Sequence, residues 1–215
     1  MTLRDLWALL DWRLLDLGGA VITLGEAVGF VTGVLCVWLL ARQSLWNWPL
    51  ALANVLLYAL IFLRAGLYAD AALQVVFAAL NSYGWWSWRR GRGDDRTGAR
   101  RELPVRRTPA AVWTGLGAAV ALGSAGVYFL LATATDSTVP LWDASTAALS
   151  LAAIYGQARK YLESWLLWIA ADLVYIPLYL YKDLWLTAVL YAVYLALCVF
   201  GWRAWRSQAM VVATP

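Results

Sequence analysis

The chain has 215 residues, of which 63% are hydrophobic and only 14% are charged, and its formal net charge is +4. Soluble domains are about half apolar and about a quarter charged, so a soluble fold of this size could not cover so much apolar surface. The composition therefore excludes a soluble globular protein and predicts an all-α integral membrane protein. The chain contains no histidine, which excludes catalysis by an imidazole, proton relays through histidine and metal sites with histidine ligands.

Residues 1–19 predict an amphipathic helix that lies in the membrane interface. Leucine and tryptophan recur at helical spacing in LRDLWALLDWRLLDLGG, and charged residues occupy much of the rest. Gly18 and Gly19 would end this helix. The acids that interrupt the stretch argue against a signal peptide.

Seven apolar stretches follow that could cross a membrane as helices, which takes about 20 mostly apolar residues each. Cys36 and Cys198 fall inside two of them and are interpreted as small hydrophobic residues, so we predict no disulfide and no zinc site. The predicted spans are residues 20–41, 47–64, 67–88, 110–132, 141–158, 163–181 and 184–203.

Residues 89–109 form a loop rich in arginine. The stretch RRGRGDDRTGARRELPVRRTP contains eight arginines with glycine and proline, and it shows no helical periodicity. Nucleic-acid binding is one interpretation, but no aromatic residue is interleaved to stack on bases. We therefore predict a solvated cytoplasmic loop and no nucleic-acid partner.

With seven spans, the basic residues divide unequally between the two sides of the membrane. Thirteen fall on the side of the arginine-rich loop and four on the other, and cytoplasmic loops carry the excess of Lys and Arg. We therefore predict the N-terminus outside and a C-terminal tail, residues 206–215, in the cytoplasm. The larger group contains Arg42, the eight loop arginines, Arg159, Lys160, Arg203 and Arg206, and the smaller contains Arg4, Arg13, Arg64 and Lys182.

The chain also resembles itself. GWWSW ends the third span and GWRAW ends the seventh, and the residues upstream of the two motifs align at a constant offset. The second span aligns with the sixth after a one-residue shift, which places Asn54 near Asp172. This pattern predicts two parallel three-helix bundles, 20–88 and 133–205, joined by a linker helix at 110–132, with a site between the halves.

The sixth span carries the residues that point most directly to a binding site. Trp165, Trp168 and Asp172 are spaced by three and four residues, so they share one helix face, which Tyr175 and Tyr179 extend. An acid that meets lipid costs about 2.5–3.5 kcal/mol on insertion scales, so Asp172 should face a cavity or a partner. A carboxylate beside aromatic planes suits a flat cation. The alternative is an interhelical hydrogen bond by Asp172 and an aromatic belt.

Further polar candidates lie in the first three spans. Gln74 and Asn81 are seven residues apart on one helix face, and Trp85 follows Asn81 by four. Amide side chains both donate and accept hydrogen bonds, as a carboxamide or a sugar would require, and Asn54 has the same capacity. Glu26 lies near the outer end of its span, where snorkelling to the interface is an equal alternative to substrate contact. For the amides the alternative is hydrogen bonding between packed helices.

WLLWIAAD, residues 165–172, resembles the Trp-x-x-Trp-x-x-x-Asn/Asp motif of the PnuC family of vitamin transporters. The likeness covers most of residues 20–205. It implies a fold similar to that of SWEET transporters in the opposite membrane orientation, and a homotrimer in the bacterial inner membrane. It also implies facilitated diffusion of nicotinamide riboside, which a cytoplasmic kinase traps as a phosphate. By this resemblance Trp165, Trp168 and Asp172 are motif residues, and Gln74 and Asn81 lie where the family's third helix makes polar contacts.

The prediction is therefore a facilitator for a cationic aromatic vitamin or nucleoside, with nicotinamide riboside first, then thiamine and riboflavin. A non-transporting membrane scaffold subunit is the alternative from another class. No phosphate-binding loop, nucleophile constellation or metal-ligand spacing occurs, so we predict no enzyme activity, no cofactor and no metal. The predicted substrate-binding residues are Trp165, Trp168, Asp172, Tyr175, Gln74, Asn81, Asn54, Trp85 and Glu26.

Overall fold

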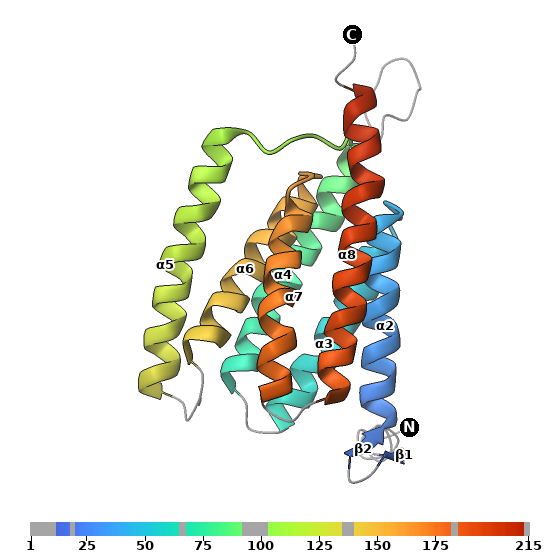
Figure 1. Cartoon of the computed structure of the whole chain (residues 1–215), viewed down its shortest axis with the longest axis vertical. Coiled ribbons are helices and arrows are strands. Elements are labelled where there is room, and N and C mark those ends of the chain that lie inside the picture. Colours follow the sequence, from blue (N-terminus) through green and yellow to red (C-terminus); the bar gives the residue numbers. More distant parts are fainter. Residues whose placement is uncertain are drawn as a thin grey trace.

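The computed structural model describes residues 12–17, 20–64, 68–91, 103–134, 140–181 and 185–212. Within them, a short hairpin is followed by seven α-helices, one for each predicted span (Figure 1). The last helix continues past the predicted end at residue 203, because hydropathy marks where the apolar run stops and not where the backbone hydrogen bonds stop. The helices are α2 (Leu24–Ala41), α3 (Asn47–Arg64), α4 (Tyr68–Arg90), α5 (Ala110–Ala134), α6 (Pro140–Ala158), α7 (Ser164–Tyr181) and α8 (Trp185–Val212).

The N-terminal hairpin corrects one prediction. β1 (Arg13–Leu17) pairs antiparallel with β2 (Ala20–Thr23), so a helix over residues 1–19 is wrong for Arg13–Leu17. The first transmembrane helix correspondingly starts at Leu24 and not at residue 20. A glycine pair is a signal for a two-residue hairpin loop as well as for a helix end, and the β-branched run AVIT favours a strand. The predicted helix over residues 1–11 lies outside the described residues.

The helices pack in two neighbouring sets. α3 packs against α2 and α4, and α7 packs against α6 and α8. The two sets meet where α2 contacts α8 and where α4 contacts α6, while α5 lies at the edge against α6 (Figure 1). Because its apolar segment has no buried residue, α5 presents most of its surface outward.

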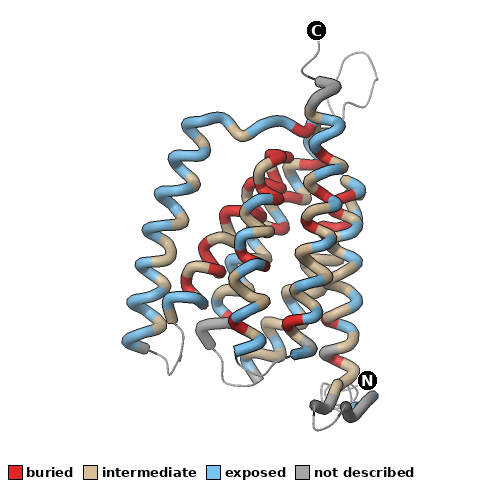
Figure 2. Tube along the Cα trace, in the orientation of Figure 1, coloured by how far each residue is buried: buried red, intermediate tan, exposed pale blue. Residues whose placement is uncertain are grey.

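Three of the described helices are long and apolar enough to cross a membrane by themselves: Ala110–Thr133, Ser164–Tyr181 and Thr187–Ala209. Shorter apolar segments occupy Ala27–Ala41 and Asn47–Leu63. α6 is buried along much of its length by its neighbours, as the red segments of Figure 2 show, so it does not need an apolar residue on every side. The seven helices confirm the predicted all-α membrane class.

A tryptophan corner is built twice in the chain. Trp48 of α3 packs edge-on against Trp88 of α4, with ring centroids 5.3 Å apart and planes at 84°. Gly84 allows this contact, since a Cβ there would clash with the Trp48 indole. The same arrangement recurs 117 residues later (165 − 48), with 5.4 Å and 88°, in Trp165, Gly201 and Trp205.

The turns that precede these tryptophans also match. Gln43 and Lys160, again 117 residues apart (160 − 43), have φ angles of 55° and 53°, an uncommon conformation for residues other than glycine. In each turn the next residue donates a backbone hydrogen bond to the carbonyl five residues earlier, at 2.9 Å and 2.8 Å. Two distant segments of different sequence therefore adopt the same local fold.

The end of the arginine-rich loop is anchored to the α6–α7 turn. The backbone N–H of Arg106 donates to the Lys160 carbonyl at 3.1 Å, and the Arg106 carbonyl accepts from Leu162 at 2.9 Å. Thr108 donates to Glu163 Oε2 from its backbone N–H at 2.7 Å and from its hydroxyl at 2.8 Å. Part of the predicted solvated loop is thus fixed against the helices, and residues 92–102 lie outside the described residues.

Candidate functional site

Asp172 lies near the middle of α7 and is only 2% exposed. The thiol of Cys198, on the neighbouring α8, is its hydrogen-bonding neighbour. No described residue donates a hydrogen bond to the second carboxylate oxygen, Oδ2. A buried polar atom without a partner in a membrane helix is costly and requires an explanation, and a bound ligand that donates to Oδ2 is one.

A group of four tyrosines lies on the same two helices, and we call it the tyrosine cluster: Tyr175, Tyr179, Tyr191 and Tyr194. Tyr175 stacks on Tyr179 at 5.6 Å, and Tyr191 lies 4.5 Å from Tyr175 and 5.1 Å from Tyr179. Tyr194 meets Tyr191 edge-on at 5.6 Å. The predicted site residue Tyr175 is therefore part of a continuous aromatic surface between α7 and α8.

Tyr194 connects this cluster to the other half of the molecule. Its ring lies within electrostatic range of both Asp172 and Tyr58 of α3. Its hydroxyl contacts Gly33 of α2, where any Cβ would clash with it, and Tyr58 makes the same kind of contact with Gly29. Asp172 is thereby placed beside the boundary between the two sets of helices.

The two motif tryptophans have different surroundings. Trp165 is fully buried. Its ring packs edge-on against Trp205 and lies directly over Gly201. Trp168 is half-buried and packs against the same hydrophobic core. Protein contacts already occupy the Trp165 ring, which favours a packing role for it over the predicted stacking on a substrate. Asp172 lies seven residues beyond Trp165, about 10 Å further along the helix.

The polar candidates of the first half make contacts within the protein. Asn54 donates from Nδ2 to the Thr32 hydroxyl at 2.7 Å and to the Gly29 carbonyl at 3.3 Å, which joins α3 to α2. At the 117-residue offset Asn54 corresponds to Ala171, so it is not the equivalent of Asp172 that the one-residue shift suggests. These contacts match the alternative interpretation, hydrogen bonding between packed helices.

Two other candidates lie on α4, and a third lies on α2. Asn81 is buried and donates to the Phe77 carbonyl of its own helix at 2.8 Å, while Gln74 is half-buried. Glu26 belongs to α2, but its side chain lies outside what the structure describes. The scaffold alternative predicts hydrogen bonds among Gln74, Asn81 and Asp172. The observed hydrogen bond of Asn81 goes instead to the Phe77 carbonyl.

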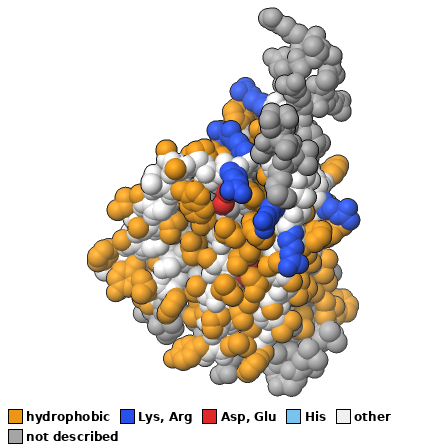
Figure 3. Space-filling view, turned by 45° about the horizontal axis from the view of Figure 1, so that its top comes forward, with side chains coloured by type: hydrophobic (Ala, Val, Ile, Leu, Met, Phe, Trp, Pro, Cys, Tyr) orange, Lys and Arg blue, Asp and Glu red, His pale blue; other side chains and the backbone are white. Residues whose placement is uncertain are grey.

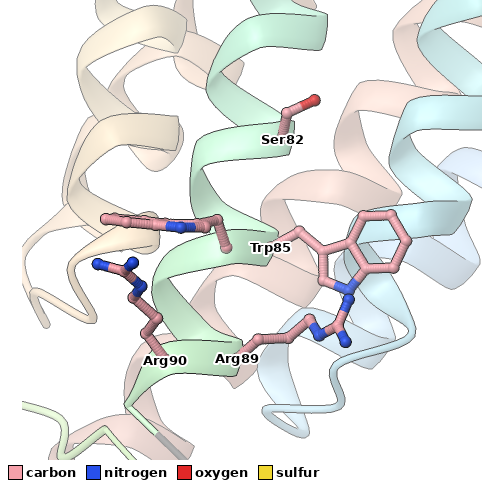
Figure 4. Close-up of a pocket in the computed structure, with 5 residues that line it drawn as sticks. Ser82, Trp85, Arg89 and Arg90 are labelled. Atoms are coloured by element: carbon pink, nitrogen blue, oxygen red, sulfur yellow. The ribbon is translucent and has the colours of Figure 1, made fainter.

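Trp85 lies near the end of α4, beside the tryptophan corner of the first half. It follows Gly84, which packs on Trp48 at the tryptophan corner, and it lines a cleft of about 390 Å³ at the end of α4. Ser82, Trp86, Arg89 and Arg90 complete that cleft (Figure 4). Asp172 and Tyr175 thus lie three residues apart on α7, whereas Trp85 belongs to the cleft at the end of α4.

Sequence reasoning missed three residues of α8: Cys198 and Tyr194, which interact with Asp172, and Tyr191, which contacts Tyr194. Tyr191, Tyr194 and Cys198 are spaced by three and four residues on α8, so the same helical spacing that linked the motif residues could have found them. Cys198 was interpreted only as a small hydrophobic residue. Among the described residues, no group of three or more Cys, Asp or Glu side chains is close enough to hold a metal ion.

Comparisons with known proteins agree on the family. A family model described as "Nicotinamide mononucleotide transporter" matches residues 23–207. The nicotinamide riboside transporter PnuC of Escherichia coli K12 is 26% identical over 89% of each chain. The riboflavin/roseoflavin transporter RibM of Streptomyces davaonensis is 31% identical over 84% of this chain and 83% of its own.

A solved structure supports the same fold. The crystal structure of the vitamin B3 transporter PnuC superimposes with a TM-score of 0.66 and 24% identity, covering 86% of this chain and 81% of that one. With the family model matching most of the chain and the helices arranged as in that structure, the chain belongs to the PnuC family of membrane vitamin transporters.

Proposed function

We propose that the protein imports nicotinamide riboside by facilitated diffusion, and that Asp172 is the substrate contact that carries this function. The supporting observation is its Oδ2 atom, which is buried in the membrane domain and receives no hydrogen bond from any described residue. A ligand with a permanent positive charge would balance the carboxylate, and its hydroxyl or amide groups would donate to Oδ2. Phosphorylation of the product in the cytoplasm would then make uptake irreversible.

The tyrosine cluster supports an aromatic, cationic substrate. Tyrosine faces attract a cation that lies over the ring, and the cluster extends from Tyr179 to Tyr194 beside Asp172. Nicotinamide riboside and thiamine both have a charged aromatic ring, so this chemistry does not separate them. Thiamine is therefore the next candidate substrate.

Riboflavin is a further candidate, because the riboflavin/roseoflavin transporter RibM is 31% identical to this chain. The flavin ring is neutral, so it would gain from the tyrosines but not from the charge of Asp172. A protein that carries flavin should therefore tolerate the loss of that charge better than one that carries a cation.

The helix contacts support a 3+1+3 architecture similar to that of SWEET transporters. α2–α4 and α6–α8 would be the two parallel three-helix bundles, with α5 as the linker. The tryptophan corner, which occurs once in each set at the same offset, is what a repeat would produce. Figure 3 shows Lys and Arg gathered at one end of the molecule, and we assign that end to the cytoplasm, with the N-terminus outside. A homotrimer is part of the same proposal.

Alternating access would then operate between the two sets of helices. At the arginine-rich end, Trp88 and Trp205 lie 6.2 Å apart, and each donates its indole N–H to a carbonyl of the other set. In this proposal these contacts would close the cytoplasmic side. Substrate bound beside Asp172 would be released when rocking of the bundles separates them.

Uptake into proteoliposomes tests the proposal. The purified chain would be reconstituted without ATP or an ion gradient and offered labelled nicotinamide riboside, thiamine and riboflavin in separate assays. We expect saturable uptake of nicotinamide riboside that unlabelled compound competes away. If only thiamine or riboflavin showed saturable uptake, that compound would take the place of nicotinamide riboside as the proposed substrate. If none of the three showed saturable uptake, the transport proposal as stated would be overturned.

A further inference from the structure

The end of α4 carries two arginines, each placed over a tryptophan one helical turn earlier. The guanidinium of Arg89 lies 5.8 Å from the ring centroid of Trp85, and that of Arg90 lies 4.4 Å from the centroid of Trp86. Figure 4 shows Arg89 beside Trp85 and Arg90 on the opposite side of the helix, with Ser82 further along α4. The cleft of about 390 Å³ is lined by these five residues.

The charge of this cleft favours an anion. Among the described residues, no Asp or Glu forms an ion pair with Arg89 or Arg90, and both arginines are exposed. Stacking on the indole rings holds each guanidinium against the helix while leaving its N–H groups available. Each guanidinium can bind phosphate oxygens through its own N–H groups, and the two arginines concentrate two positive charges at one helix end.

The position of the cleft favours an anion that is part of a lipid. Trp86 is 51% exposed, and on the same helix Val75 and Val76 are 68% and 45% exposed, so this face of α4 presents apolar side chains on the outside of the single chain. Val76 lies 14 residues before Arg90, which is about 21 Å along the helix and enough for an acyl chain to lie beside it. Tryptophan and arginine at the end of a membrane helix are placed at the level of the headgroups.

We propose that this cleft binds an anionic phospholipid, with its headgroup attracted by the charges of Arg89 and Arg90 and the acyl chains lying along Val75 and Val76. Anionic lipids attract basic residues at the membrane surface, and the double arginine concentrates this attraction at one helix end. The site is separate from Asp172 and does not depend on the proposed substrate.

Two other arginines provide a matched control. Arg42 lies 5.1 Å from Trp38 on α2, and Arg206 lies 5.2 Å from Trp202 on α8, each with the same one-turn spacing. Both are exposed, but each supplies one guanidinium to its surface and not two. Substituting both removes the same charge as substituting Arg89 and Arg90.

The experiment measures lipid binding by the purified full-length chain in detergent, using native mass spectrometry with added phosphatidylglycerol or phosphatidylcholine. We expect wild type and the R42Q/R206Q variant to retain phosphatidylglycerol, and the R89Q/R90Q variant to lose affinity roughly tenfold or more. Phosphatidylcholine should bind all three weakly. R89K/R90K, which keeps both charges but lacks the guanidinium N–H forks, should recover part of the affinity.

Three results would overturn the proposal. Equal losses in R89Q/R90Q and R42Q/R206Q would mean that only general surface charge attracts the lipid. Competition by millimolar inorganic phosphate would identify a site for a soluble anion. A change in oligomeric state in R89Q/R90Q alone would identify an interface between copies of the chain.

Discussion

Lys160 and Gln43 occupy equivalent positions in the two helical turns and contact each other directly. The Lys160 ammonium donates to Gln43 Oε1 at 2.6 Å and lies 4.5 Å from the ring centroid of Trp88. Gln43 in turn donates to Gln208 of α8. The two sets of helices are therefore joined at the arginine-rich end by the same two turns that repeat each other.

Replacing Lys160 should weaken this junction. The side chain is only 3% exposed, so K160M leaves Gln43 without its charged donor and removes the contact with the Trp88 ring. We expect a loss of about 1–3 kcal/mol in the free energy of unfolding, measured as a lower midpoint in thermal unfolding in detergent. R203Q, at an exposed position, is the control and should change stability by less than about 0.5 kcal/mol. Equal midpoints for the two variants would contradict the role of Lys160.

The two glycines of the tryptophan corners should not tolerate a side chain. In G84A and G201A the new methyl group would clash with the indole of Trp48 or Trp165, forcing α3 from α4 or α7 from α8. We expect each variant to lose about 1–3 kcal/mol of stability and to give a lower yield of monodisperse protein on size exclusion.

G115A and G126A are the matched controls for those variants. Both glycines lie on α5 with no atom within 4 Å of the position of a new Cβ. They should be neutral or stabilising by up to about 1 kcal/mol, because alanine favours the helix. If G84A or G201A were as stable as G115A and G126A, the indole ring would not be held in the position that the tryptophan corner gives it.

Removing the charge of Asp172 separates a binding role from a structural one. D172N keeps the shape of the side chain but removes the anion, so affinity for nicotinamide riboside or thiamine should fall at least tenfold, which is about 1.4 kcal/mol. Titration calorimetry on the purified protein measures this. Stability should be unchanged or higher, because burying an amide costs less than burying a carboxylate. Unchanged affinity for every cationic ligand, with reduced stability, would show that Asp172 only holds the helices together.

Asn54 is expected to have a structural role and no role in substrate binding. Its hydrogen bond to Thr32 joins two helices, so N54A should lower stability by about 0.6 kcal/mol, with about 2 kcal/mol as the upper limit, and should leave uptake near the wild-type level. A double-mutant cycle with T32A measures the coupling between the two side chains. A coupling near zero, together with a loss of uptake, would return Asn54 to the substrate site.

The helices were accessible from the sequence because a membrane requires long apolar segments whatever the fold. The stretch 47–64 was predicted with the same limits as α3 (Asn47–Arg64) for that reason. The hairpin strand Arg13–Leu17 was not predicted, because the leucines in this stretch are compatible with either a helix or a strand. Pairing with Ala20–Thr23 selects the strand. Periodicity describes one segment, whereas a strand depends on its partner.

The sequence by itself determined the membrane class, the positions of the seven helices, and the face of α7 that carries Asp172. Only the tertiary structure decided what that face meets: Trp165 is enclosed by Gly201 and Trp205, and Asp172 adjoins Tyr194 and Cys198. The physical reason is that hydropathy and spacing act within one helix. The burial of a side chain and the partners of its polar atoms depend on which other helix packs against it, and the chain brings those helices together over long sequence distances.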